Sequence, residues 1–222
     1  MISIAVDGPS GSGKSSLAKS ISKMLGILYL DTGALYRAIG YTCLNQLGED
    51  ITEAQVYALL PALTVDLGYQ DSVQHVYVNG EDVSSFIRTQ PVAMAASKVS
   101  AFPQVRAFLL DLQRSIAAKN DVIMDGRDVG TVILPNADVK IFLTAKPEVR
   151  ASRRVGELAE KGIQADFDTV LKEVLQRDHN DSTRAVAPLK QADDAVLLDN
   201  SLRDAEQTVN DALEIIRSKV SL

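Results

Sequence analysis

Residues 8–15, Gly-Pro-Ser-Gly-Ser-Gly-Lys-Ser, constrain the fold of this chain more than any other segment. They fit the pattern G-x-x-x-x-G-K-[ST] in full. The apolar residues 2–7 before them predict a buried strand, and residues 14–25 after them carry apolar side chains at helical spacing. Glycines let the backbone N–H groups of such a loop turn towards phosphate oxygens, and the helix N-terminus adds partial positive charge. The sequence therefore predicts a loop that binds the phosphates of a nucleoside triphosphate.

Two side chains of this loop carry the expected chemistry. The Lys14 ammonium is expected to reach the β- and γ-phosphates, and the Ser15 hydroxyl is expected to coordinate Mg²⁺. The residues predicted to bind the nucleotide are Gly8, Pro9, Ser10, Gly11, Ser12, Gly13, Lys14, Ser15 and Ser16.

Many classes of nucleotide-binding protein share this loop, and the rest of the sequence excludes several of them. A GTPase needs an Asn-Lys-x-Asp segment and an Asp-x-x-Gly segment after a strand, and the sequence contains neither. A helicase or a transporter ATPase needs a chain longer than these 222 residues. Small kinases remain, together with nucleotide-binding switches.

The other predicted elements indicate an α/β fold. Strands are expected at residues 2–7, 27–30, 121–124, 139–143 and 195–198. A strand, a helix and a strand within the first 30 residues are typical of a βαβ unit, which implies parallel pairing. Helices are expected at 14–25, 34–47, 92–118 with a break near Phe102-Pro103, 147–160, 166–178, and after a capping box at 201–204. We predict one P-loop NTPase domain over residues 1–222, with a five-stranded parallel sheet flanked by helices.

Residues 63–83 differ in character from the rest of the chain. Residues 63–67 and 73–78 are typical of strands, and Asn79-Gly80 between apolar stretches predicts a two-residue hairpin turn. This antiparallel pattern interrupts an alternation of helices and parallel strands. It predicts a small antiparallel β insert near residues 63–90.

The charge balance limits the partners of the chain. Lys and Arg number 23 against 29 Asp and Glu, which gives a net charge of −6 and a pI of about 5.0. A nucleic-acid surface normally makes a domain basic, so we expect no nucleic-acid partner. Twelve of the basic residues are arginines, several of them in residues 150–184. Because Arg binds phosphate through two parallel hydrogen bonds, local arginines still fit a small phosphorylated ligand.

The sequence also indicates where the protein works. No apolar stretch approaches the roughly 20 residues that a membrane span needs, and the first residues show no secretory signal. Cys43 is the only cysteine, so no internal disulfide can form. We therefore expect a cytoplasmic protein without a membrane partner.

Two charged segments follow expected strands, where ligands bind in open parallel sheets. In residues 31–37, Arg37 lies one helical turn beyond the strand and can reach an acceptor phosphate. The alternative is that residue 31 or 32 caps the helix and Arg37 is solvated. In residues 125–128, Asp125 can orient waters on Mg²⁺ and Arg127 can pair with phosphate. The alternative there is a strand-end turn without function.

Residues 150–184 hold two further clusters of charge. Each cluster alone is typical of a solvated helix face. Together they bracket Gly162, which favours a mobile helical lid over residues 150–184 that brings arginines to a transferring phosphoryl group. The first cluster consists of Arg150, Arg153 and Arg154 on one helix, and the second, expected just after the next helix, of Arg177, Asp178, Asp181 and Arg184.

Neither histidine is expected to act as a general base. His75 falls in the predicted insert and His179 in the predicted lid, where structural or surface roles are expected. A hydroxyl acceptor usually needs a base, whereas a nucleoside monophosphate is largely dianionic near pH 7 because its second pKa is about 6. The sequence therefore favours a phosphate acceptor, for which positioning and charge neutralisation suffice.

Several motifs combine into a more specific pattern, and together they resemble the bacterial cytidylate kinases, a family of nucleoside monophosphate kinases. The likeness covers nearly the whole chain. The phosphate loop alone is generic, but the Ala-Ala-Ser, Pro-x-Val-Arg and Gly-Arg-Asp segments belong to the cytosine site of that family. Departures are mild: residues 104 and 182 are Gln and Ser where some relatives are basic, and Ser15-Ser16 replaces Gly-Thr. The matching segments are 7–14, 31–37, 80–83, 87–89, 95–97, 102–106, 125–131, 181–184 and 187–189.

The resemblance implies a role for each matched residue. Ser97, Arg106 and Asp128 would read the cytosine edge, with Arg106 donating to O2 and N3 and Asp128 accepting from the exocyclic amine. The acceptor phosphate would be held by Arg37, Arg127 and Arg177. Asp181 would bind the ribose hydroxyls with Arg184 nearby, and Thr32 would lie beside the acceptor. The implied catalytic set is Lys14, Arg127, Arg153, Arg154 and Arg177, and the implied Mg²⁺ ligands are Ser15 and Asp125.

The resemblance implies transfer of the γ-phosphoryl group of ATP, with Mg²⁺, to CMP or dCMP, in a monomer that serves pyrimidine nucleotide metabolism. Two alternatives stay open on the residues alone. One is a kinase for a hydroxylated metabolite, in which Asp125 or Asp128 acts as the base. The other is an ATP-binding protein without turnover.

Overall fold

The computed structural model describes residues 1–71, 73–160 and 162–220. The chain forms two compact units, which are described separately below. Unit 1 consists of Met1 and Leu28–Asp121, and unit 2 of Ile2–Ile27 and Val122–Leu222. Residues 72 and 161, in the predicted insert and the predicted lid, lie outside the described residues. In the part of the chain that the structure describes, no helix is long and apolar enough to span a membrane.

A five-stranded sheet of order β2-β6-β1-β7-β8 carries the phosphate loop. Within unit 2, β1 pairs in parallel with β6 and β7, and β7 pairs in parallel with β8. The predicted fold class, a five-stranded parallel sheet with a small antiparallel insert, is confirmed. The strands are β1 (Ser3–Asp7), β2 (Leu28–Asp31), β6 (Val122–Gly126), β7 (Val139–Thr144) and β8 (Val196–Asp199).

The two central strands of unit 2 are continuous apolar runs because both of their faces are buried. Ile4, Ala5 and Val6 of β1, and Ile123 and Met124 of β6, have no exposed surface. The register pairs Asp7 with Gly126, so β1 and β6 end at the same level. The segments that follow them therefore leave from one edge of the sheet.

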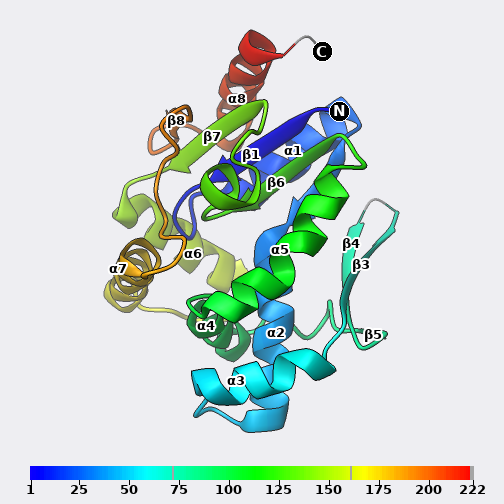
Figure 1. Cartoon of the computed structure of the whole chain (residues 1–222). Coiled ribbons are helices and arrows are strands. Elements are labelled where there is room, and N and C mark those ends of the chain that lie inside the picture. The colour runs from blue at the N-terminus through cyan, green and yellow to red at the C-terminus, as the bar shows by residue number, and fades with distance from the viewer. Residues whose placement is uncertain (72, 161, 221–222) are drawn as a thin grey trace. The chain divides into compact units, whose positions relative to one another are not determined.

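Helices of unit 2 flank these strands. In Figure 1, α1 and α8 lie beside each other, and α1 contacts β6 while α8 contacts β7 and β8. The helices α6 and α7 pack on each other through Ala151, Val170 and Val174. The helices are α1 (Lys14–Leu25), α6 (Pro147–Glu160), α7 (Phe167–Thr183) and α8 (Ala205–Lys219), and Val129–Ile133 form a short π-helix, η2.

Two helix boundaries of unit 2 correct the sequence prediction. Helix α7 runs to Thr183 rather than ending near residue 178, so Arg177 and Asp181 lie within the helix and not after it. Helix α8 is capped by Asp204, whose carboxylate accepts from Gln207 N at 2.8 Å. The predicted cap, Ser201, instead donates its hydroxyl to Asp199.

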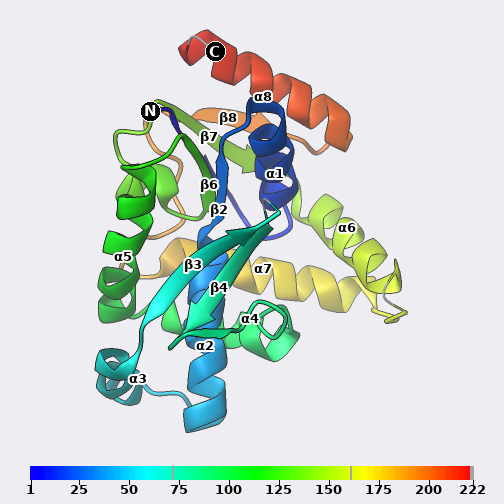
Figure 2. The ribbon, with the colours of Figure 1, turned by 90° about the vertical axis from the view of Figure 1, so that its right-hand side faces the viewer.

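Unit 1 contains the insert and the remaining helices. The strands β3 (Val65–Gln70), β4 (Val73–Val78) and β5 (Glu81–Asp82) form an antiparallel sheet of order β3-β4-β5, and Figure 2 shows the long twisted pair of β3 and β4. Asn79 and Gly80, with φ of 52° and 82°, form the predicted hairpin turn. The helices are α2 (Thr32–Leu47), α3 (Glu53–Leu59), α4 (Gln90–Val99) and α5 (Pro103–Ala117), and Leu60–Ala62 form a 3₁₀ turn, η1.

Capping explains two of the differences in unit 1. Helix α2 begins two residues earlier than predicted because the Asp31 carboxylate accepts from Ala34 N at 3.0 Å. Helix α3 was not predicted, and a capping box between Thr52 and Gln55 starts it. The predicted break near Pro103 is confirmed, because Pro103 opens α5 after α4 ends at Val99.

Candidate active site

The phosphate loop leaves β1 in a conformation that only glycine accepts. Gly8 has φ of +150°, and a Cβ atom there would lie 1.9 Å from the Leu143 carbonyl oxygen of β7. The loop therefore runs directly against the neighbouring strand, and its following residues reach the N-terminus of α1. Backbone N–H groups and the helix end at this point favour an anion.

Lys14 is buried at the start of α1. Its Nζ donates to the Pro9 carbonyl oxygen at 2.8 Å and lies 3.5 Å from Ser12 Oγ, so the side chain turns back over its own loop. Burial, followed by the charge of Arg127, lowers the pKa of Lys14, while the carboxylates of Asp125, Asp7 and Asp181 act in the opposite direction. A phosphate anion beside this ammonium would offset the cost of its burial.

Ser15 and Asp125 meet at the end of β6. The Ser15 hydroxyl donates to Asp125 Oδ2 at 2.8 Å. Within the described ranges, no group of three or more His, Cys, Asp or Glu side chains is arranged to hold a metal ion. One hydroxyl and one carboxylate fit Mg²⁺ all the same, because this ion usually binds proteins through one or two side chains and completes its shell with water and phosphate oxygens.

The turn after β6 forms two ion pairs with the α7 region, through Arg127 and Asp128 of the turn. Arg127 Nε donates to Asp181 Oδ2 at 2.7 Å. Arg184 Nη2 lies 3.4 Å from Asp128 Oδ1, and the Asp128 residue is only 3% exposed. Sequence positions more than 50 residues apart thus form two adjacent ion pairs, and the residues predicted at these positions lie together in unit 2.

Asp7 is a buried carboxylate to which the sequence assigned no role. Its two oxygens accept from Val129 N at 2.8 Å and from Gly130 N at 2.7 Å, at the start of η2. Burial raises the pKa of Asp7 to about 6, although the two backbone hydrogen bonds oppose the shift. One sequence signal could have pointed to Asp7: it is a charged residue at the end of an apolar strand, directly before Gly-Pro. Asp7 connects the end of β1 to the segment that follows Asp128.

The arginines of α6 have three different sets of partners. Arg150 forms an ion pair with Asp178 and donates to the Ser10 carbonyl oxygen at 2.9 Å. Arg153 donates to Asn200 through both Nη atoms, and Asn200 Nδ2 in turn donates to the Ser12 carbonyl oxygen at 3.0 Å. Arg154 pairs with Glu157 on the surface of the same helix. Arg150, which the prediction placed in the lid cluster without a binding role, and Asn200, which it did not name, both contact the phosphate loop.

Arg177 lies on α7 one turn before Asp181. Burial and then the charge of Arg127 lower the pKa of Arg177, while the Asp181 carboxylate acts in the opposite direction. The guanidinium groups of Arg127 and Arg177 repel each other beside the Asp181 carboxylate, so positive charge is concentrated at this point. Such a concentration favours a bound anion.

In unit 1, Asp31 gathers the charged groups at the end of β2. Arg37 Nη2 donates to Asp31 Oδ2 at 2.6 Å, and Arg88 Nη2 lies 3.7 Å from the same oxygen. Asp31 also caps α2, so the capping interpretation is correct, but Arg37 is paired and only partly exposed rather than solvated. Arg37 Nε is buried without a hydrogen-bond partner among the described residues. An unpaired guanidinium N–H is a donor available to a phosphate oxygen.

The remaining predicted residues also belong to unit 1. Thr32 is buried as the first residue of α2. Ser97 lies on α4, half buried. Arg106 lies in the first turn of α5, where its Nη1 donates to the Ser100 carbonyl oxygen at 3.1 Å. The structure thus brings Thr32, Arg37, Ser97 and Arg106 into unit 1, and the phosphate loop with the other predicted residues into unit 2.

Comparisons with known proteins agree on one family. The family model described as Cytidylate kinase matches residues 4–218. The chain is 46% identical over 221 residues to "Cytidylate kinase" of Mannheimia succiniciproducens, covering 100% of this chain and 98% of the relative. It is 44% identical over 219 residues to "Cytidylate kinase" of Geobacillus sp., covering 99% and 98%.

A solved structure supports the fold at lower sequence similarity. An uncharacterized protein from Eubacterium ventriosum aligns with a TM-score of 0.56 at 13% identity, over 98% of this chain and 99% of that chain. At that identity the likeness concerns the fold alone.

Proposed function

This chain belongs to the cytidylate kinase family, and from that premise we propose that it transfers the γ-phosphoryl group of ATP to CMP or dCMP. The products are ADP and CDP or dCDP, so the protein is a nucleoside monophosphate kinase. The observation that carries the proposal is the match of the family model over residues 4–218, which includes the phosphate loop and every predicted site residue. The kinase of a hydroxylated metabolite and the ATP-binding protein without turnover are less well supported.

The donor nucleotide is held by the phosphate loop in this proposal. The backbone N–H groups of residues 8–16 surround the β- and γ-phosphates, and the buried Lys14 ammonium neutralises their charge. Gly8 fits this role because its close approach to Leu143 leaves no space for a side chain. Lys14 exchanges the Pro9 carbonyl oxygen, its present acceptor, for a phosphate oxygen.

Ser15 and Asp125 are the residues that would hold Mg²⁺. Their oxygens are 2.8 Å apart and of the chemical type that this ion prefers. When bound with ATP, the ion supplies neutralisation of the charge that develops on the phosphate oxygens. Asp125 also favours the charged form of Lys14, so this carboxylate would serve both the ammonium and a bound Mg²⁺.

The acceptor phosphate is bound by Arg37, Arg127 and Arg177. Support comes from the unpartnered buried Nε of Arg37 and from the mutual repulsion of Arg127 and Arg177. A dianionic phosphate needs no general base, because it is already a nucleophile near pH 7. These guanidinium groups orient it for in-line attack on the γ-phosphorus.

The base and the ribose are recognised by polar groups that are mostly buried. Ser97, Arg106 and Asp128 bind the cytosine edge, and Thr32 lies near the acceptor. Arg106 donates to O2 and N3, and Asp128 accepts from the exocyclic amine. Uracil presents a carbonyl and a ring N–H at these positions, and each unsatisfied buried group costs about 1–3 kcal/mol. Asp181 binds the ribose hydroxyls with Arg184 beside it.

The predicted lid, residues 150–184, supplies the last charges. When the lid closes, Arg153 leaves Asn200 and Arg154 leaves Glu157, and both arginines bind ATP phosphate oxygens instead.

We further propose that the protein is a cytoplasmic monomer without nucleic-acid or membrane partners, and that residues 1–222 act as one kinase domain with its insert at 63–90. The buried Cys43 fits a reducing compartment.

ADP release from Mg²⁺·ATP, coupled to a reporter, tests the reaction. We expect strong stimulation by CMP and dCMP, weak stimulation by UMP, and none by AMP, GMP or hydroxylated acids. Equal rates with AMP or GMP would contradict the base assignment. ADP release with a hydroxylated acid alone, or ATP binding without any acceptor-stimulated release, would favour one of the two alternatives.

Two variants test the residue roles. Arg106→Met is expected to raise the KM for CMP while the KM for ATP stays unchanged, and unchanged CMP kinetics would exclude Arg106 from base recognition. Asp181→Ala is expected to damage acceptor use through the sugar contacts and to leave ATP binding intact. Equal damage to both substrates would count against that role.

A further inference from the structure

We propose, on the basis of the function proposed above, that Tyr36 is a positioning residue for base selection. Its ring holds the guanidinium of Arg106 in the orientation that distinguishes cytosine from uracil. Tyr36 and Arg106 both lie in unit 1, on α2 and α5, and no role for Tyr36 follows from the resemblance or from the reaction itself.

The guanidinium of Arg106 lies over the ring of Tyr36. Arg106 Cζ is 5.3 Å from the ring centroid. Both residues are buried, Tyr36 at 8% exposure and Arg106 at 7%. A guanidinium within about 6 Å of an aromatic face is attracted to the negative charge of that face, and more strongly when water is excluded. The ring therefore both orients Arg106 and offsets the cost of burying its charge.

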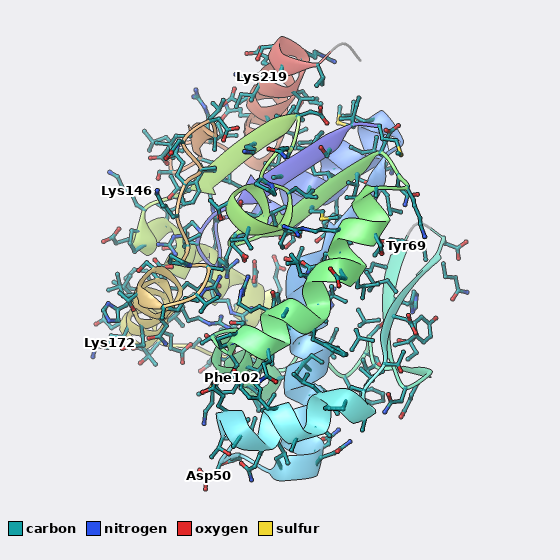
Figure 3. All side chains as sticks on the ribbon, in the orientation of Figure 1. Asp50, Tyr69, Phe102, Lys146, Lys172 and Lys219 are labelled. Carbon is teal, nitrogen blue, oxygen red and sulfur yellow. The ribbon has the colours of Figure 1, made fainter. Side chains whose placement is uncertain are left out.

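A second contact controls rotation of the guanidinium within its plane. Nη1 of Arg106 donates to the Ser100 carbonyl oxygen at 3.1 Å, and the Ser100 hydroxyl donates to the Ser97 carbonyl oxygen at 2.9 Å. Ser100 thereby connects Arg106 to the backbone of Ser97. Phe102, labelled in Figure 3, precedes α5, and its carbonyl oxygen accepts from Arg106 N.

Helix α2 is itself held close to the helix that carries Ser97. Gly40 lies one turn after Tyr36, and a Cβ atom at Gly40 would be 2.7 Å from Ala96 N of α4. Such a close approach leaves little freedom for α2 to shift along α4. Tyr36, Ser97 and Arg106 therefore belong to one rigid set within unit 1.

Orientation of Arg106 matters because cytosine and uracil differ in hydrogen-bond polarity at N3. Cytosine presents an acceptor there, whereas uracil presents an N–H that would face the N–H donors of Arg106. A guanidinium that can rotate away from this conflict discriminates less between the two bases. Loss of the ring is thus expected to weaken CMP use and to narrow the difference between CMP and UMP.

Tyr36 also belongs to the apolar core of unit 1, so a simple truncation would not separate positioning from packing. Fluorinated phenylalanines at position 36 separate the two, because added fluorine withdraws charge from the ring face while the ring keeps nearly the same shape. Tyr36→Phe serves as the reference of this series. The same analogues at Phe86, whose ring stacks on Tyr41 in the same unit, provide the matched control.

With increasing fluorination at position 36 we expect the KM for CMP to rise stepwise, by about tenfold over the series. The ratio of kcat/KM for CMP to that for UMP should fall in parallel, while the KM for ATP stays constant. The series at Phe86 should leave all of these constant. A flat series at position 36, or an equal rise in the KM for ATP, would overturn the positioning role of Tyr36.

A coupling experiment gives an independent readout. Tyr36→Leu is expected to raise the KM for CMP in the otherwise native protein and to add little in the Arg106→Met background, because the ring acts through that arginine. Full additivity of the two substitutions would overturn the proposal. A native protein that does not respond to CMP at all would instead overturn the proposed function, and the two failures are therefore distinguishable.

Discussion

Arg150 and Asp178 form a two-hydrogen-bond ion pair between α6 and α7, with distances of 3.0 Å from Nη1 to Oδ1 and 2.5 Å from Nη2 to Oδ2. The same Nη1 donates to the Ser10 carbonyl oxygen of the phosphate loop, and Nε donates to the Ala145 carbonyl oxygen. One buried guanidinium therefore joins both predicted lid helices to the loop. Its position indicates that packing of α7 and the shape of the loop depend on each other.

We expect Asp178→Ala to lower the free energy of unfolding by about 3 kcal/mol, because it leaves a guanidinium that is 3% exposed without its counter-charge. Urea titration followed by circular dichroism measures the change. Glu157→Ala is the matched control, since its pair with Arg154 joins side chains that are 39% and 59% exposed and should contribute less than about 1 kcal/mol. Equal losses in the two variants would contradict a structural role for the Arg150–Asp178 pair.

Asp7 should make stability depend on pH below neutrality. Burial raises the pKa of Asp7 from 3.8 to about 6, so the folded protein binds more protons than the unfolded chain between these values. The stabilisation that comes from the protonated Asp7 carboxyl is fully present below the pKa of Asp7 in the unfolded chain. It is lost as the pH rises through the pKa of Asp7 in the folded protein. We expect the free energy of unfolding, relative to Asp7→Asn, to fall by about 2 kcal/mol between pH 4.5 and pH 7. A difference between the two proteins that stays constant across this range would show that Asp7 does not titrate in this way.

Local signals in the sequence predicted most elements correctly. Helix α1 begins at Lys14 and ends at Leu25 as expected, because the glycine-rich loop and the apolar spacing mark both ends. Helix α7 was expected to end five residues earlier, at residue 178, and no proline or glycine marks its actual end at Thr183. Helix α3 was missed because its seven residues are too few to show a helical period. Its start is set instead by the capping box between Thr52 and Gln55.

The sequence named candidate site residues but could not name the contacts that each of them makes. A motif can locate Arg150 on a helix face, but its Ser10 partner is 140 residues away in the chain. The bonds from Asp7 to Val129 and Gly130 span more than 120 residues. Such pairs depend on strand order and register, which a single sequence does not specify. This is why Asn200 and Asp7 were absent from the predicted site.

Lys14 should take up a proton when ATP binds. Burial, and then the charge of Arg127, lowers its pKa to about 7, so we expect the free protein to carry a largely neutral amine at pH 8. Phosphate oxygens beside the amine favour the charged form, and we expect uptake of about one proton per ATP. Calorimetry at pH 8 in buffers of different ionisation enthalpy measures this number. Lys14→Met should abolish the uptake, and the same buffer dependence in both proteins would assign the proton to another group.

Gly40 should be intolerant of even one methyl group because α2 and α4 approach each other there. A Cβ atom would lie 2.7 Å from Ala96 N and 3.1 Å from the Ala95 carbonyl carbon, both backbone atoms that a side-chain rotation cannot move. We expect Gly40→Ala to lower the free energy of unfolding by about 1–3 kcal/mol and to raise the KM for CMP, since α4 carries Ser97. Gly156→Ala is the matched control: this glycine lies within α6 with no atom within 4 Å of the added Cβ, so the change should stabilise the protein by about 0.5–1 kcal/mol. If Gly40→Ala stabilised the protein as Gly156→Ala does, the close approach of the two helices would not exist in solution, and the rigid set that holds Ser97 and Arg106 would lose its basis.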